Sequence, residues 1–276
     1  MCLIAFAIGA NARWPLVIAA NRDEAYARPS AGLARWTGPR GHSIVSGRDL
    51  RDGGAWLGVS ESGRVAMLTN VRAGTPQTGA RSRGELVSRW LDGDEDFAAY
   101  CQALQLHSSA DAFAGFNLVT GDCQRQAWHW VSNRSHGQRS LHTCGLQTRQ
   151  LQPGIYGLSN AALDTPWPKT LALKSALLGS LAALDFDGLV AQLMPALLNS
   201  QSAAVQDLPD TGIAPELELV LSSAFVRSPS YGTCSSAIIG VGSTGPGTAG
   251  KLDFLEHSHL APAQERKLSL RWPAIA

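Results

Sequence analysis

The chain is poor in charge and has no long apolar run, and these two absences exclude broad classes of protein. Charged residues make up 16% of its 276 residues, against roughly 25% in an average domain. A net charge of +1 excludes nucleic-acid binding driven mainly by electrostatics. The longest apolar run, Cys2 to Ala10, is far shorter than the ~20 residues of a membrane-spanning helix. We therefore expect a soluble globular protein without a nucleic-acid partner or an integral membrane segment.

Paired cysteines are also absent. The five cysteines are widely spaced, form no C-x-x-C pair and are odd in number, which argues against a disulfide framework. They are Cys2, Cys101, Cys123, Cys144 and Cys234. The histidines, including His142, lack the spacing of a zinc site, so we expect no bound metal. Because no basic leader precedes the first apolar segment, we expect a cytoplasmic location.

The charges are distributed unevenly along the chain. Residues 1–89 contain 12 arginines and six acidic residues, a local charge of +6, and the remainder carries −5. This pattern is compatible with dispersed, solvated arginines. It is also compatible with an anion-binding face for carboxylates or phosphates, because the guanidinium group presents a rigid fork of donors.

Strand and helix patterns alternate in blocks along the sequence. Apolar segments bounded by turn residues predict strands, and a 3.6-residue period predicts helices. The expected strands cover 2–8, 16–20, 55–59, 64–69, 115–120, 126–131, 155–159, 217–226, 235–241, 251–256 and 267–272. The expected helices cover 82–91, which begins at a capping box from Ser82 to Glu85, then 95–105, 168–178 and 187–198, the last with Asp187 as its cap. Two packed sheets covered by helix pairs would bury this pattern, and we expect one domain over 1–276.

Cys2 is the residue with the clearest chemical potential. Removal of Met1, which a small second residue normally allows, would make Cys2 N-terminal. Its own α-amino group, with a pKa of roughly 7.7–8.0, could then take the thiol proton. The alternative is a cysteine that fills a strand in the core, which is the usual place of a free cysteine.

Four polar residues, Asn21-Arg22-Asp23-Glu24, directly follow the second apolar segment. If segments 2–8 and 16–20 pair as a hairpin, this cluster lies near the level of Cys2. Arg22 could then lower the pKa of the thiol, and Asp23 could hold the amine. The alternative is an ordinary exit from a strand with a local ion pair.

Together these residues resemble the NRDE-motif family, that of transport and Golgi organization protein 2. The resemblance rests on Met1-Cys2, Asn21-Arg22-Asp23-Glu24, Arg28-Pro29, Gly47-Arg48-Asp49-Leu50, Leu68-Thr69-Asn70-Val71-Arg72, Ser82-Arg83-Gly84-Glu85-Leu86, Leu158-Ser159-Asn160, Trp167-Pro168-Lys169 and Tyr231-Gly232-Thr233. The motifs spread over nearly the whole chain. The resemblance implies an α+β fold, the four-layer αββα sandwich of two antiparallel sheets found in N-terminal-nucleophile hydrolases.

By analogy with cysteine acylases, the resemblance implies a hydrolase that cleaves a non-peptide amide through a thioester at Cys2. Arg22 and Asp23 would lie beside the nucleophile, Asn160 near the amine, and Asn70 would donate to the oxyanion. Strand-end capping is the alternative role for both asparagines. One position departs from the family: Cys234 follows Thr233 where an arginine is common, so that role is vacant or filled elsewhere, for example by Arg227.

The resemblance also implies a second, non-enzymatic hypothesis. The family is associated with haem trafficking and with lipid and acyl-CoA metabolism, and haem or CoA anions would suit the arginine-rich first third. The two leading hypotheses are therefore an amidohydrolase that needs no cofactor and a carrier of haem or another amphipathic anion. A partner-binding scaffold in membrane trafficking is a third. Substrate, activity and oligomeric state are left open by the sequence.

Overall fold

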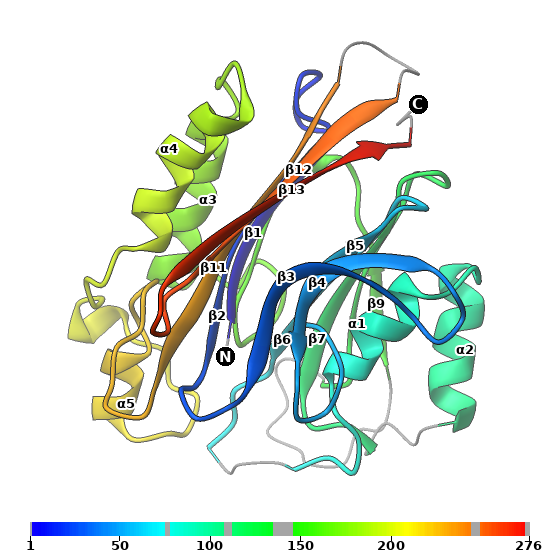
Figure 1. Cartoon of the computed structure of the whole chain (residues 1–276). Coiled ribbons are helices and arrows are strands. Elements are labelled where there is room, and N and C mark those ends of the chain that lie inside the picture. The colour runs from blue at the N-terminus through cyan, green and yellow to red at the C-terminus, as the bar shows by residue number, and fades with distance from the viewer. Residues whose placement is uncertain (1, 75–77, 108–111, 135–145, 244–248, 274–276) are drawn as a thin grey trace.

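Two antiparallel sheets pack face to face in the computed structural model, which describes residues 2–74, 78–107, 112–134, 146–243 and 249–273 (Figure 1). The first sheet has the order β10 (Gly154–Leu158), β1 (Cys2–Ile8), β2 (Leu16–Ala25), β11 (Tyr231–Gly242), β12 (Gly250–Ser258) and β13 (Gln264–Trp272). The second runs in chain order: β3 (Ser30–Thr37), β4 (Ser43–Asp49), β5 (Leu57–Ser60), β6 (Arg64–Asn70), β7 (Phe116–Asp122), β8 (Ala127–Ser132) and β9 (Gln147–Gln150).

Helices cover the outer face of each sheet. α3 (Pro168–Ser180) and α4 (Phe186–Leu197) lie on the first sheet, and α1 (Gly84–Leu91) and α2 (Phe97–His107) lie on the second (Figure 1). A short helix, α5 (Pro215–Val220), and a 3₁₀ turn at Val205–Asp207 precede β11. The predicted αββα sandwich is therefore confirmed. Within the described residues, no helix has the length and apolar character needed to cross a membrane.

The first strand shows why the sandwich forms. Alternate side chains of a strand point to opposite faces of the sheet. Ile4 and Phe6 of β1 belong to the core between the two sheets, whereas Leu3 and Ala5 belong to the core under α3 and α4. Because β1 is buried on both faces, its sequence is a continuous apolar run rather than an alternation of apolar and polar residues.

Several predicted elements need correction. The segment 217–226 is not a strand, because Pro215 occupies a first helical position and starts α5. β2 continues to Ala25, so Asn21 to Glu24 lie inside the strand rather than after it. The sequence does not predict β3, β4 and β9: β3 and β9 are largely exposed or half-buried, and β4, although mostly buried, has only two large apolar residues, Ile44 and Val45.

The predicted helix caps are wrong in detail. No side chain caps α1, and Glu85 instead binds Arg81, so the capping box with Ser82 does not form. The N-cap of α4 is Asp185, whose carboxylate accepts from the backbone N–H of Gly188, and not Asp187. His142 and Cys144 lie outside the described residues.

Phe6 tests the core between the sheets. Its fully buried ring stacks on Tyr156 with ring centroids 5.3 Å apart. We expect Phe6→Ala to lower the free energy of unfolding by about 3–5 kcal/mol, measured by urea denaturation. Leu171, which is 51% exposed on α3, is the control, and Leu171→Ala should change stability by less than roughly 0.5 kcal/mol. Equal losses in both variants would contradict this description of the core.

Candidate functional site

A row of five residues crosses the first sheet at the level of Cys2. The strand registers pair Cys2 with Arg22, Arg22 with Ser235, Ser235 with Ser258, and Ser258 with Gln264. All five line one cavity of about 750 Å³ between the two sheets. The hairpin hypothesis is thus confirmed, and it places Cys2 and Arg22 directly opposite each other.

Small side chains keep this end of the sandwich open. One row deeper, Ala20 and Ala237 lie beside Glu256 in the same register. On the facing sheet, Gly32 and Gly47 leave no side chain, and a Cβ at Gly47 would lie 3.1 Å from the Glu256 carboxylate. The sheets therefore approach closely at Glu256, whose carboxylate accepts from the backbone N–H of Leu33 at 2.7 Å, and a hollow remains toward Cys2.

Cys2 is 8% exposed at the start of β1. Burial raises the pKa of its thiol; the neighbouring Asp23 charge also raises it and the Arg22 charge lowers it. Arg22 is itself nearly buried, and its nearest carboxylate oxygen, on Glu24, is 3.6 Å away. A buried neutral thiol of this kind becomes a nucleophile only when a base takes its proton.

Asp23 faces the opposite side of β2 and is buried. Its carboxylate accepts a 2.7 Å hydrogen bond from the Thr233 hydroxyl, and its backbone carbonyl accepts from the Tyr231 hydroxyl at 2.9 Å. Burial raises the pKa of Asp23, and the positive charge of Lys169 acts in the opposite direction. Asp23 is therefore fixed in place by β11, and a lysine from α3 partly offsets the effect of burial on its carboxylate.

Lys169 is a site residue to which sequence reasoning gave no role. The side chain is buried at the start of α3, and its ammonium group donates to the backbone carbonyl of Leu221 at 2.8 Å. Burial lowers the pKa of Lys169 to about 8, although Asp23 opposes the shift. The available signal was its position in the Trp167-Pro168-Lys169 motif, since a charged residue directly after a helix-starting proline otherwise indicates an exposed helix end.

Asn70 and Asn160 are brought together at the other side of Cys2. The Asn160 amide nitrogen donates to Asn70 Oδ1 at 2.9 Å and to the Asn70 backbone carbonyl at 3.2 Å. Ser159, next to Asn160, donates to the backbone carbonyl of Cys2 at 3.2 Å. Asn70 lines the cavity. All five predicted site residues therefore gather around one end of this cavity.

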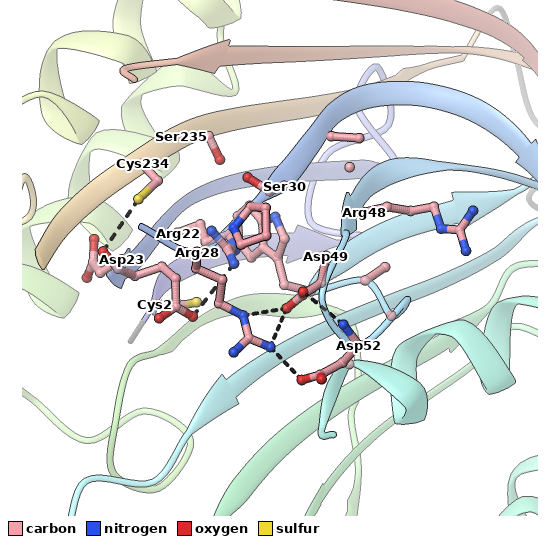
Figure 2. A pocket seen from close by; sticks show the side chains of 18 of the residues that line it. Cys2, Arg22, Asp23, Arg28, Ser30, Arg48, Asp49, Asp52, Cys234 and Ser235 are labelled. Carbon is pink, nitrogen blue, oxygen red and sulfur yellow. Dashed lines mark hydrogen bonds and ion pairs between the residues drawn. The ribbon is translucent and has the colours of Figure 1, made fainter. Parts of the chain in front are cut away.

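The cavity wall is strongly polar and carries both signs of charge. Figure 2 shows the Arg28 side chain between Asp49 and Asp52, with which it forms hydrogen bonds of 2.7 and 2.6 Å. Arg48 instead lies over the Trp36 ring, with its guanidinium carbon 4.5 Å from the ring centroid. Among the described residues, no carboxylate oxygen lies within 4.0 Å of the guanidinium nitrogens of three cavity arginines: Arg48, Arg83 and Arg266.

The position that departs from the family lies in a β-bulge. The register of β11 against β2 shifts between Thr233 and Ser235, which places Cys234 in the bulge with its thiol 3.5 Å from the carbonyls of Glu24 and Gly232. Arg227 does not take the missing arginine's place, because it is exposed, stacks on Phe225 and does not line the cavity.

Arg83 is the second site residue to which sequence reasoning gave no role. It precedes α1, lines the cavity and donates to the backbone carbonyl of Gly115 at 3.0 Å. Burial lowers the pKa of Arg83, and the Cys2 thiolate opposes this shift. In the sequence Arg83 belongs to the predicted capping box and to the family motif Ser82-Arg83-Gly84-Glu85-Leu86, and neither indicates that its side chain lines the cavity.

The chain belongs to the transport and Golgi organisation 2 family, whose model matches residues 1–260. It is 35% identical over 266 residues to the transport and Golgi organization protein 2 homolog of Bos taurus. The aligned region covers 89% of this chain and 90% of the relative.

Solved structures resemble the fold at low sequence identity. A mutant conjugated bile acid hydrolase from Clostridium perfringens is similar with a TM-score of 0.45 and 11% identity, covering 97% of this chain and 92% of that one. The Caenorhabditis elegans ortholog of N-acylethanolamine-hydrolyzing acid amidase gives a TM-score of 0.47 at 10% identity, covering 87% and 92%.

The buried Lys169 predicts a pH dependence of stability. Its pKa is about 8 in the folded protein against an ordinary 10.5, so between these values the unfolded chain binds more protons. The free energy of unfolding should therefore rise with pH across that window, by on the order of 3 kcal/mol from this group. We expect urea denaturation to show that rise in the wild type relative to Lys169→Met. If the difference in unfolding free energy between wild type and Lys169→Met does not change from pH 8 to 10.5, the pKa of Lys169 is not lowered by burial, which would contradict this description.

Proposed function

We propose that the protein is an amidohydrolase that cleaves a non-peptide C–N bond with the Cys2 thiol. The observation that carries the proposal is the position of Cys2, which lies in the wall of a cavity with Arg22, Asp23 and Asn70 around it. Removal of Met1 would expose the α-amino group of Cys2 as the base that the buried thiol needs.

The reaction proceeds in two steps, formation of a thioester on Cys2 and its hydrolysis. The Cys2 sulfur attacks the amide carbon while its proton passes to the α-amino group, and Asn70 donates to the oxyanion. The C–N bond then breaks, the amine leaves with the proton, and a thioester remains on Cys2. Water attacks the thioester and gives its proton to the α-amino group, and the acid leaves as the thiol is restored.

The neighbouring charges support this assignment. Asp23 is fixed by Thr233 at 2.7 Å. Burial raises the pKa of Asp23 and the positive charge of Lys169 opposes that rise; as a carboxylate, Asp23 favours the protonated amine that forms when Cys2 is deprotonated. Arg22, opposite Cys2 in the register, favours the thiolate. The two charges act on different partners: Arg22 favours the thiolate, whereas Asp23 favours the ammonium and itself raises the pKa of the thiol.

A carrier of an amphipathic anion is the second candidate. Its support is that Arg48, Arg83 and Arg266 line the cavity without a carboxylate oxygen within 4.0 Å among the described residues. Phosphates such as those of CoA, or haem propionates, would fit such donors. Few large apolar side chains line the cavity, Trp56 and Leu68 among them. The cavity therefore fits a polar anion better than the apolar faces of haem.

Turnover of an amide library, followed by mass spectrometry, tests the hydrolase. We expect Cys2→Ala to lose more than about 10³-fold in rate while keeping its fold, because it removes the nucleophile. Cys101→Ala is the matched control, since Cys101 is a half-buried thiol on α2 that does not line the cavity, and it should keep full activity.

An active, folded Cys2→Ala variant would contradict the hydrolase mechanism. The carrier predicts a different result: a Soret band on adding haem, or saturable binding of acyl-CoA. That binding would be weakened by Arg83→Gln and unchanged in Cys2→Ala.

A further inference from the structure

A buried arginine lies behind the two asparagines of the site. Arg72 follows β6, and its side chain forms an ion pair with the buried Glu218 of α5. Its guanidinium carbon also lies 5.0 Å from the ring centroid of Trp167. The backbone N–H of Arg72 donates to the backbone carbonyl of Asn160 at 2.8 Å. Arg72 is thus held rigidly from three sides and placed against Asn160.

The guanidinium group dictates which end of the Asn160 amide faces it. Arginine carries only donors, and its Nη2 lies 3.5 Å from Asn160 Oδ1. The single hydroxyl hydrogen of Ser159 is shared between this oxygen, at 3.1 Å, and the backbone carbonyl of Cys2, at 3.2 Å. A reversed amide would oppose the Asn160 NH₂ group to the guanidinium NH₂ group. Asn160 must therefore present its NH₂ group on the other side, where Asn70 lies.

The orientation of the Asn160 amide in turn determines that of the Asn70 amide. Its Oδ1 accepts from Asn160 at 2.9 Å, so the remaining end of the Asn70 amide is its NH₂ group, a pure donor. Asn70 lines the cavity that contains Cys2. The chain of hydrogen bonds from Arg72 thus decides whether Asn70 offers a donor or an acceptor to a substrate oxygen.

We propose that Arg72 is a positioning residue that, through Asn160, locks the Asn70 amide with its NH₂ group available to the oxyanion formed at Cys2. The inference rests on the proposed amidohydrolase function and adds a residue that touches neither substrate nor nucleophile. A freely rotating asparagine would present its carbonyl oxygen part of the time, and an acceptor facing an oxyanion repels it. A fixed donor requires no reorganisation during the reaction.

Asn160→Asp tests the lock because it reverses one hydrogen bond while keeping the shape of the side chain. An aspartate at this position accepts from Arg72 and from Ser159 but cannot donate to Asn70. Asn70 must then turn its NH₂ group inward and its carbonyl oxygen toward the cavity. Two rates at Cys2 are measured: acylation by p-nitrophenyl acetate, which passes through an oxyanion, and alkylation by iodoacetamide, which does not.

The ratio of acylation to alkylation is the readout. We expect it to fall about 10²–10³-fold in Asn160→Asp, the loss typical of one oxyanion donor. Asn70→Asp should show the same fall with Arg72 and Asn160 undisturbed. Asn199→Asp, an exposed change of the same kind after α4, should leave the ratio unchanged.

Changes at Arg72 provide a second test if Asn160→Asp is unstable. Arg72→Lys keeps a pure donor that can pair with Glu218, so the ratio should be largely retained. Arg72→Gln offers a donor or an acceptor to Asn160, so the ratio should fall. A purely structural role for Arg72 would alter the melting temperature in both variants and leave the ratio unchanged.

Two results would overturn the proposal in distinguishable ways. A wild-type Cys2 that is acylated no faster than Cys101 would overturn the amidohydrolase function, and the positioning role with it. Rapid acylation of wild-type Cys2, with an unchanged ratio in folded Asn160→Asp and in Arg72→Gln, would overturn the positioning role alone.

Discussion

The antiparallel pairing of β1 with β2, and of β2 with β11, is the constraint on which the rest of the site depends. It fixes Cys2 opposite Arg22 and Arg22 opposite Ser235. Because side chains alternate between the faces of a strand, Arg22 and Asp23 point to opposite faces of β2, with Asp23 toward Lys169 of α3, and both border the cavity. The strand register therefore places the charges of Arg22 and Asp23 on different sides of Cys2. A slip by one residue would exchange them.

Burial gives these charges their effect. Asp23, Lys169, Arg72 and Glu218 are all nearly inaccessible to water, and charges interact more strongly in such surroundings than at a surface. Arg72 and Glu218 form a direct ion pair. Lys169 and Asp23 instead act on each other's pKa and are held by a backbone carbonyl and a threonine hydroxyl. This is a costly arrangement for folding alone, and it is the kind of arrangement that marks functional sites.

The sequence predicted the sandwich and the residues around Cys2, because both follow from local signals. The continuous apolar run of β1 and the polar cluster that follows Ala20 are visible in the sequence. The motifs that resemble the family supplied Asn70 and Asn160. The parts that were missed depend on distant contacts. Lys169 and Arg83 resemble exposed helix starts until the fold buries them, and residues 217–226 resemble a strand until Pro215 starts a helix there.

The intact mass of the purified protein, followed by limited labelling with iodoacetamide and mapping of the adduct, tests the central claim most directly. The account predicts that Met1 is absent and that Cys2 is labelled before Cys101, the half-buried thiol whose pKa burial raises to about 11. Retention of Met1, or labelling of Cys2 no faster than Cys101, would contradict the assignment of Cys2 as an activated nucleophile.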